Sequence, residues 1–388
     1  MAENSMKPRI RFKGYTDAWE QRKLCSIATK VIEKNENTRI VETFTNSAEF
    51  GIISQRDYFD HDISNFDNLS GYYVVQNNDF VYNPRISVTA PVGPINRNKL
   101  GRKGVMSPLY MVFRASNIDF TFMEWYFKSE HWHGFMKFNG DSGARSDRFS
   151  IKDEIMFQMP LPYPNIHEQE LVGEILLKID NLITLHQRKY DKIVNIKKAL
   201  LEKMFPSDAE TTPKIRFKGF TDAWEQRKLR EVFDYERPDT YIVKSDKYSD
   251  TYSTPVLTAN KGFILGYTNE MQVCNKECII FDDFTLDSKY VTFPFMVKSS
   301  ALKILTAKIG YFLPFAYQLL QATNIEILGH ARHYISVVQP TKVLIPSNDE
   351  QIRIGKCIQQ IDNLITLHQR QLEKLKNIKS ALLEKMFV

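Results

Sequence analysis

The sequence predicts an α+β fold: two tandem mixed α/β domains separated by two long antiparallel helices, which form a coiled coil with pseudo-twofold symmetry. Three observations predict it, namely a duplicated opening segment, a duplicated helical segment, and unlike middle segments rich in short strand patterns. The chain has 388 residues, of which 43% are hydrophobic and 25% charged. This composition excludes a disordered or collagen-like chain, and the length suits two domains.

The first duplication opens each half of the chain. Pro8–Leu24 reads PRIRFKGYTDAWEQRKL, and Pro213–Leu229 repeats it with 15 of 17 positions identical. Between each copy and the helix that follows, the two middles share only weak similarity. We therefore expect one frame that carries two different surfaces.

The second duplication lies in the helices. IDNLITLHQR at Ile179–Arg188 returns letter for letter at Ile361–Arg370, and ALLEKMF closes both segments. The opening repeat recurs after 205 residues and the helical repeat after 182, so the first middle is longer. The predicted organisation is a first domain at 1–165, a helix at 166–205, a second domain at 206–349 and a second helix at 350–388.

Both helical segments carry an apolar stripe at three- and four-residue steps, uninterrupted by Pro or Gly over Asp180–Met204 and Asp362–Met386. Such helices are about 57 Å long and most economically cover their stripes against each other. His186 and His368 fall in this seam, where a packed or register-setting role outweighs metal binding or catalysis. The expected helix-pair interface comprises Ile175, Ile179, Leu182, Ile193, Leu200, Ile361, Leu364, Leu375 and Leu382.

The middle segments, 25–165 and 230–349, have the pattern of short strands punctuated by Gly, Pro and Asn. Helical stretches are expected around Phe122–Phe138 and Tyr311–Ala322. The predicted strands are Gly71–Gln76, Asp79–Tyr82, Tyr110–Phe113, Glu277–Phe281 and Lys342–Pro346.

Basic residues beside Gly, Asn and Ser are candidates for contact with nucleic acid, although the net charge of +6 is only compatible with it. The loop NRNKLGRKG suits phosphates, and Arg or Asn elsewhere suits guanine or adenine edges. A solvated charged loop explains the same residues equally well. The candidates are Asn83, Arg85, Arg97, Lys99, Arg102, Lys103, Arg145 and Arg148 in the first domain, and Lys261, Lys289, Tyr290, Arg332 and His333 in the second.

Signatures of catalysis are missing from the sequence. It has no phosphate-binding loop of the G-x-x-x-x-G-K-[ST] type, no G-x-G-x-x-G turn, and no amino-methyltransferase motif, since Asn83-Pro84 is followed by Arg85. Cys274 and Cys278 lack a second ligand pair, so we expect no metal site and no catalytic residue. A nuclease cluster of Asp282, Asp283, Asp287 and Lys289 is the less favoured alternative to an acidic surface turn.

The first residues lack the apolar core of a signal peptide, and no apolar run is long enough to span a membrane. Four scattered cysteines suggest reduced thiols rather than a disulfide framework. We therefore expect a soluble, cytoplasmic protein.

The repeats carry a resemblance. WEQRKL at Trp19–Leu24 and Trp224–Leu229, LPYPNIHEQ at Leu161–Gln169 and the duplicated IDNLITLHQR resemble the DNA specificity subunit of type I restriction–modification systems over essentially the whole chain. The second helix start, IPSNDEQ, departs from the pattern by lacking the second proline.

The resemblance implies that the two middles are target-recognition domains, each reading one half of a bipartite, asymmetric DNA site. It also implies that the helices set the gap and dock two methyltransferase subunits, with restriction subunits joining further out. S-adenosylmethionine, ATP and Mg²⁺ would bind those partners, and no cofactor this chain. The alternatives left open are a self-contained nuclease or methyltransferase, and a coiled-coil adaptor that never contacts DNA.

Overall fold

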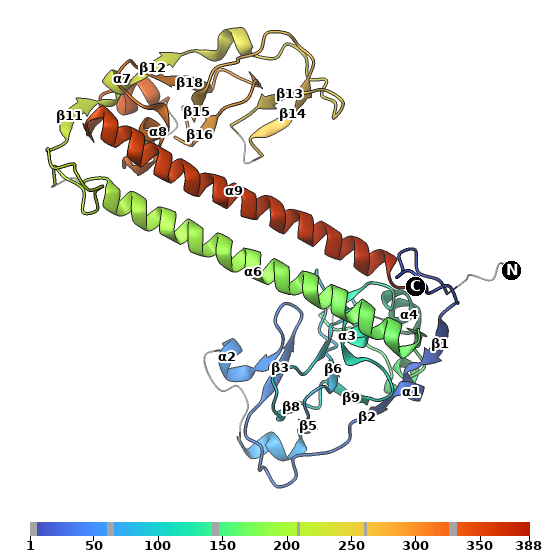
Figure 1. The fold of residues 1–388 in the computed structure, drawn as a ribbon. Helices are drawn as coiled ribbons and strands as arrows, with labels where there is room; N and C mark the ends of the chain where they lie inside the picture. The colour runs from blue at the N-terminus through green and yellow to red at the C-terminus, as the bar shows by residue number, and fades with distance from the viewer. Residues whose placement is uncertain (1–5, 60–65, 142–146, 208–209, 260–261, 326–331) are drawn as a thin grey trace. The chain divides into compact units, whose positions relative to one another are not determined.

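The computed structural model describes residues 6–59, 66–141, 147–207, 210–259, 262–325 and 332–388. The chain forms two compact units, Met1–His186 with Gln371–Val388, and Gln187–Arg370. Each unit contains one mixed domain and parts of both long helices, α6 (Ile166–Met204) and α9 (Asn348–Lys385) (Figure 1). The first half of α6 and the last part of α9 therefore belong to the first unit, and the rest of each helix belongs to the second. No helix among the described residues is long and apolar enough to cross a membrane.

The first unit is built on a four-stranded sheet in the order β2-β9-β6-β7, joined by the pairs β3-β4, β5-β8 and β1-β10. Every pairing between these strands is antiparallel. Its elements before α6 are β1 (Glu20–Lys23), α1 (Leu24–Ile27), β2 (Ala28–Lys30), β3 (Phe44–Ser47), β4 (Gly51–Ser54), α2 (Gln55–Phe59), the 3₁₀ turn η1 (Phe66–Gly71), β5 (Tyr73–Val75), β6 (Phe80–Tyr82), β7 (Ile95–Arg97), β8 (Gly104–Met106), β9 (Met111–Ala115), α3 (Phe120–Lys128), α4 (His133–Asn139), α5 (Asp153–Met156) and β10 (Pro160–Tyr163).

The second unit repeats this frame. Its four-stranded sheet has the order β12-β18-β15-β16, with β14-β13-β17 and β11-β19 beside it. Its elements before α9 are β11 (Glu225–Lys228), α7 (Leu229–Val232), β12 (Phe233–Glu236), the 3₁₀ turn η2 (Pro238–Tyr241), β13 (Thr254–Leu257), β14 (Ile264–Thr268), β15 (Cys278–Asp282), β16 (Ser288–Val291), β17 (Met296–Val297), β18 (Leu302–Ala307), α8 (Leu313–Ala322), the π-helical turn η3 (Tyr334–Val338) and β19 (Lys342–Ile345).

The predicted α+β fold is confirmed, and the predicted strands appear as β5, β6, β9, β15 and β19 with ends shifted by one or two residues. The helix expected around Phe122–Phe138 is two helices, α3 and α4. The break falls at Ser129, whose extended backbone ends α3 and whose hydroxyl donates to the carbonyl of Tyr126 at 2.6 Å. A serine that bonds the backbone of the preceding turn competes with continued helix, which explains the interruption.

The duplicated opening segment holds the start of each long helix. In the first unit Glu168, fully buried, accepts two hydrogen bonds from the guanidinium of Arg11, at 2.6 and 2.9 Å, and one from the Trp19 indole at 3.0 Å. The backbone N–H of Ile10 donates to the carbonyl of Lys385, which fixes the same segment to the end of α9. The segment therefore ties together both helices and the domain.

The second unit makes the same contacts with its own copies. Arg216 donates to Glu350 at 2.7 and 2.8 Å, and Ile215 N–H donates to the carbonyl of Lys203. Trp224 differs, because its buried indole N–H has no hydrogen-bond partner among the described residues. The two opening segments are thus nearly identical in sequence and make equivalent contacts with the long helices, each in its own unit.

The residue after each glutamate joins the helix to the domain. Gln169 donates to the carbonyl of Pro164 and accepts from the backbone N–H of Asp119, just before α3. Gln351 does the same with Pro346 and with Phe312, just before α8. One buried amide in each unit therefore bonds the backbone before two helices, and it pairs an N–H group at the start of α3 or α8 that the helix itself leaves without a partner.

The helices pair antiparallel within each unit. Lys379 of α9 forms an ion pair with Asp180 of α6 at 2.5 Å, and in the other unit Lys197 pairs with Asp362 at 2.6 Å. These two pairs occupy equivalent repeat positions. They show that both halves of the helix pair use the same register.

The predicted helix interface differs from the structure in part. Ile179 is buried, and Ile193, Ile361 and Leu375 are half-buried. Ile175 and Leu382 pack on the core of the first domain, and Leu200 on that of the second, because the helix ends are covered by the domains. The structure departs from the prediction at Leu182 and Leu364, which are 44% and 46% exposed. Two helices bury only a narrow seam, and these leucines lie beside it. His186 and His368 are half-buried.

Two glycines permit the close approach of each long helix to its domain. A Cβ on Gly355 would lie 2.8 Å from the backbone nitrogen of Phe315, and one on Gly173 would lie 3.2 Å from that of Phe122. We expect Gly355→Ala to lower the free energy of unfolding by about 1–3 kcal/mol, because backbone must shift. Urea denaturation measures this. The control is Gly134→Ala, a helical glycine with open space, which should keep or raise stability by up to about 1 kcal/mol because alanine favours a helix; equal losses in the two variants would contradict the packing argument.

Candidate nucleic-acid interface

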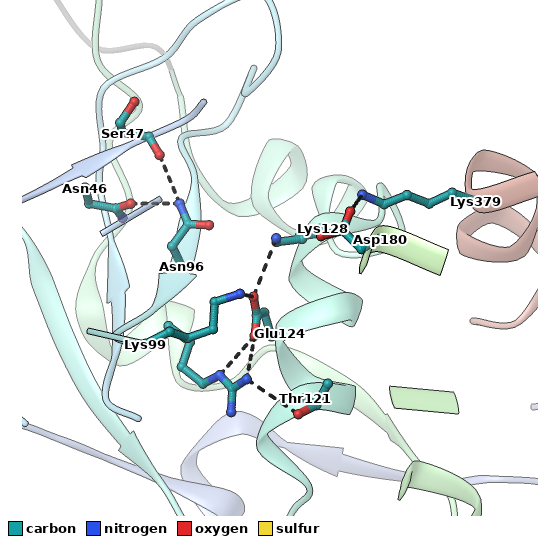
Figure 2. A network of polar contacts seen from close by, with 10 residues as sticks. Asn46, Ser47, Asn96, Lys99, Thr121, Glu124, Lys128, Asp180 and Lys379 are labelled. Atoms are coloured by element: carbon teal, nitrogen blue, oxygen red, sulfur yellow. Dashed lines mark hydrogen bonds and ion pairs between the residues drawn. The ribbon is translucent and has the colours of Figure 1, made fainter. Parts of the chain in front are cut away.

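The β3–β4 hairpin is the centre of the candidate site in the first unit. Asn46, buried in β3, donates from its amide to the carbonyl of Val81 at 2.7 Å and accepts from the Asn96 amide at 2.8 Å. Asn96 also donates to the carbonyl of Ser47 at 3.2 Å. These amides fasten the hairpin to the sheet (Figure 2). Its turn, Ala48–Phe50, is exposed.

One concave surface beside the hairpin, which we call the arginine pocket, has a volume of about 470 Å³ and is lined by Asn83, Arg85 and Arg148 among others. Asn83 donates to the carbonyl of Asn46 and accepts from the backbone of Arg85. Arg85 is 70% exposed and pairs with Asp147 at 3.8 Å, a contact of little energy at the surface. The structure thus brings together three of the residues predicted from sequence.

On the other side of the hairpin lies the lysine pocket, of about 550 Å³, lined by Arg97, Lys99 and Lys128 among others. Its centre is Glu124 of α3, which is 4% exposed and forms ion pairs with all three cations, at 2.8, 2.7 and 3.5 Å (Figure 2). Because one carboxylate faces three cations, this cluster of four side chains carries a net charge of +2. Lys99 is 53% exposed and faces solvent.

Burial raises the pKa of Glu124, but the hydrogen bond from Lys99 and the charges of Lys99, Lys128 and Arg97 outweigh it, so the pKa lies below its ordinary value. The Lys128 pKa is lowered by burial. Lys128 and Lys379 also place their ammonium groups 4.9 and 4.8 Å from the Trp125 ring. The cationic cluster is therefore continuous with the contact between α3 and α9.

The remaining candidates of the first domain are separate from the pockets. Arg102 donates three hydrogen bonds to Glu42, at 2.7 to 3.0 Å, which occupies its guanidinium. Lys103 is exposed in the same loop. Arg145 lies outside the described residues.

The described candidates of the second domain lie on different elements, two on β16 and two just before η3. Lys289 on β16 is exposed, Tyr290 donates its hydroxyl to Glu277, and Arg332 lies 6.0 Å from the Phe284 ring. His333 is 1% exposed, with its backbone N–H on the carbonyl of Asp283 at 3.0 Å. Because its ring is buried, His333 is left out of the candidate surface. Lys261 lies outside the described residues.

Two of the three carboxylates considered for a nuclease stabilise the fold, whereas Asp287 is exposed. Asp282, 4% exposed, accepts from the Phe284 backbone and the Thr285 hydroxyl. Asp283 accepts from the Tyr334 backbone at 2.7 Å and pairs with buried Lys303 at 3.4 Å. Both carboxylates are thus taken up by local hydrogen bonds.

Cys274 and Cys278 are buried, and their thiols hydrogen bond with each other, which lowers the pKa of Cys274 to about 7. Among the described residues no group of three or more His, Cys, Asp or Glu could hold a metal ion.

Sequence reasoning missed the apolar residues around the pockets. Phe50, at the hairpin turn, is 60% exposed, and Val88, in a neighbouring loop, is fully exposed. It also missed Lys128, which falls inside a helical pattern. Ala48 and Gly51 recur as Ala259 and Gly262 in the other half, and that similarity marks the position of the turn but not its exposed ring.

Comparisons with known proteins agree with this architecture. A family model of the type I restriction modification DNA specificity domain matches residues 221–377. The specificity subunit of the type I restriction enzyme EcoR124I/EcoR124II from Escherichia coli is 43% identical over 129 residues, which are 31% of this chain and 32% of that subunit. The putative type I restriction enzyme MjaX specificity subunit of Methanocaldococcus jannaschii is 22% identical over 257 residues, 60% of each. The chain thus spans about a third and three fifths of these relatives.

Among solved structures, the S subunit of the type I restriction–modification system from M. genitalium has a similar fold, with a TM-score of 0.70, 15% sequence identity and coverage of 99% of each chain. The shared fold is that of a tandem-domain protein, in which two unlike domains are built on two long helices. Residues 221–377 match the type I restriction modification DNA specificity domain family, and the chain is similar in sequence to type I specificity subunits.

Proposed function

We propose that the chain is a non-catalytic, sequence-specific DNA-binding subunit of a type I restriction–modification complex, and that each domain reads one half of a bipartite, asymmetric site. The observation that carries the proposal is the duplication: the same opening segment, helix contacts and sheet order recur in both units, whereas the surfaces differ. Such a chain presents two different reading surfaces on one frame.

Tandem reading explains why one chain keeps both domains. Two linked modules gain affinity from a high effective concentration only when both can engage their sites at once. Each wrong base pair costs about 1–3 kcal/mol, and the costs at separate positions add, so two half-sites give a strict recognition. The continuous helices α6 and α9 are the elements we expect to set the unread gap.

The exposed apolar residues of the helices support docking of two methyltransferase subunits. Each unit exposes an equivalent set at 38% to 48%, with two leucines from one helix and an isoleucine from the other. Exposed apolar patches on otherwise polar helices are typical of protein interfaces. The sets are Leu182, Leu185 and Ile378 in the first unit, and Leu364, Leu367 and Ile196 in the second.

The duplicated sets predict a stoichiometry. We expect Leu182→Asp with Leu185→Asp to yield a complex that holds one methyltransferase subunit instead of two, because charge cannot be buried without a partner. Adding Leu364→Asp with Leu367→Asp should leave none. Native mass spectrometry counts the subunits. Ile309→Asp, a change at a fully exposed residue outside the helices, is the control and should retain two. Two bound subunits in the quadruple variant would exclude these residues as the docking site.

The proposal assigns S-adenosylmethionine, ATP and Mg²⁺ to partner subunits, and restriction subunits to the complete complex in the cytoplasm. The rival enzyme hypothesis makes an opposite prediction for the purified chain. It requires crosslinking of S-adenosylmethionine to this chain or metal-dependent cleavage of DNA without partners. Either result would replace the non-catalytic assignment.

The direct test is the pattern of adenine methylation in cells that express the chain with its methyltransferase. We expect one bipartite motif to be methylated when the chain is present and to lose its methylation when only this gene is deleted. Single-molecule sequencing reads both states. Retention of the motif after deletion would refute the proposed reading function, and so would failure of the complex to shift any duplex.

A further inference from the structure

The β3–β4 hairpin places an exposed aromatic residue between two cationic pockets. Phe50 is 60% exposed at the turn, and its ring lies 6.2 Å from that of Tyr58 in an edge contact. Ala48 and Glu49 line both the arginine pocket and the lysine pocket, so the turn is the wall between them. The cations therefore flank a two-stranded ribbon on both sides.

A two-stranded ribbon with cations on both sides is the kind of element that a DNA groove accepts. The major groove of B-DNA is about 12 Å wide and admits a two-stranded β ribbon, and the phosphates of the two strands form its two rims. We propose that the β3–β4 hairpin of the first domain enters the major groove, with Phe50 against a base edge and with each pocket holding phosphates of one strand. The proposal rests on the proposed DNA-reading function and specifies its element and residues.

The hairpin is held in shape before DNA arrives. The Ser47 hydroxyl accepts from the backbone N–H groups of Glu49 and Phe50, at 3.2 and 3.3 Å, which fixes the turn. Asn46 and Asn96 fix its base to the sheet, as described above. A preorganised ribbon loses little conformational entropy on binding, which favours recognition.

The charges on each side suit phosphate contacts. In the arginine pocket, Arg85 and Arg148 face a single acidic lining residue, Glu49. In the lysine pocket, Glu124 is already shared by three cations, and the exposed Lys99 extends from that cluster. The acidic residues left at the rims are Glu49 and Glu130. Glu49 at the turn fits the cytosine amino group, a donor in the major groove.

The second domain has a hairpin at the equivalent place in chain order, β13–β14, and its turn has a different sequence. Ala48-Glu49-Phe50-Gly51 in the first domain corresponds to Ala259-Asn260-Lys261-Gly262. Asn260 and Lys261 lie outside the described residues, so the proposal concerns the first domain. Unlike turns on a shared frame are what two different half-sites require.

The first test removes the aromatic tip. The probe is a duplex with the motif found methylated in cells, and the protein is the full chain with its methyltransferase subunits. Phe50→Ala should weaken binding to this duplex roughly tenfold or more while binding to random DNA stays the same. Methylation should become relaxed in one half-site only. Phe138→Ala, which removes a ring 90% exposed in α4, is the matched control and should match the wild type. Unchanged affinity and motif in Phe50→Ala would overturn the hairpin proposal.

The second test separates phosphate contacts from base contacts. Lys99→Gln and Arg148→Gln should each reduce the slope of log affinity against log salt by about one, equally for specific and random DNA, whereas Phe50→Ala leaves the slope unchanged. Ethylation interference should mark phosphates on both strands of one half-site. Interference at the phosphates of one strand only would overturn the proposed placement of the hairpin in the groove. A wild-type complex without preference for any duplex would instead refute the underlying DNA-reading function.

Discussion

Replacing Glu168 by alanine should lower the free energy of unfolding by about 3–5 kcal/mol, because it leaves a buried cation without its partner. Glu168 is fully buried, and Arg11 is 13% exposed, so water can screen little of the loss. The same carboxylate accepts the indole N–H of buried Trp19, which would also become unpaired. Urea denaturation, monitored by hydrogen exchange of the backbone amides in the first unit, measures this change in the free energy of unfolding.

The duplication supplies matched controls for this variant. Glu350→Ala breaks the equivalent pair with Arg216 but disturbs no indole, so we expect a smaller loss, near the lower end of that range. Glu20→Ala removes an exposed pair with Arg22, whose members are 66% and 40% exposed, and should change stability by less than about 1 kcal/mol. If Glu168→Ala cost no more than Glu20→Ala, the buried pair would not be what holds the opening segment.

The frame of the molecule could be predicted from sequence because it depends on local patterns. The stripe of α6 and α9 is a periodicity within each segment, and the two opening repeats are visible by identity alone. The contacts that explain why the two opening segments are nearly identical could not be predicted from the sequence. Arg11 and Glu168 are 157 residues apart, and only the fold shows that they meet.

The surroundings of the candidate residues could be predicted only in part, because they too depend on contacts between distant parts of the sequence. How far a basic residue is available to DNA depends on its acidic partners, which are distant in sequence. Lys99 shares the single carboxylate of Glu124 with two other cations and stays exposed. Arg102 is occupied by Glu42, 60 residues away, and His333 is buried, although both have the same kind of sequence neighbours as Arg148. Phe50 gave no signal, because a single exposed aromatic residue forms no pattern.

If the proposed function holds, exchange of residues 25–165 for the corresponding segment of a type I specificity subunit that reads a different site should replace one half of the methylated motif and leave the other half and the gap unchanged. We expect the sequence of that half-site to be replaced entirely, because the exchanged segment contains the β3–β4 hairpin and both pockets. The contacts that hold the frame, Arg11 with Glu168 and Lys379 with Asp180, lie outside it. Sequencing of methylated adenines in cells that express the hybrid with its methyltransferase measures the outcome.

A narrower exchange of the hairpin turn alone distinguishes reading from folding. Transfer of the exposed turn, residues 48–50, retains α3, α6, the Glu124 cluster and the buried residues of β3 and β4, so the hybrid should melt as the parent does while one half-site changes. Loss of both half-sites in either hybrid would mean that the domains do not read independently, and an unaltered motif would place the reading surface elsewhere. Because the buried contacts to α6 and α9 recur in both units, independent reading is the result that the duplicated frame favours.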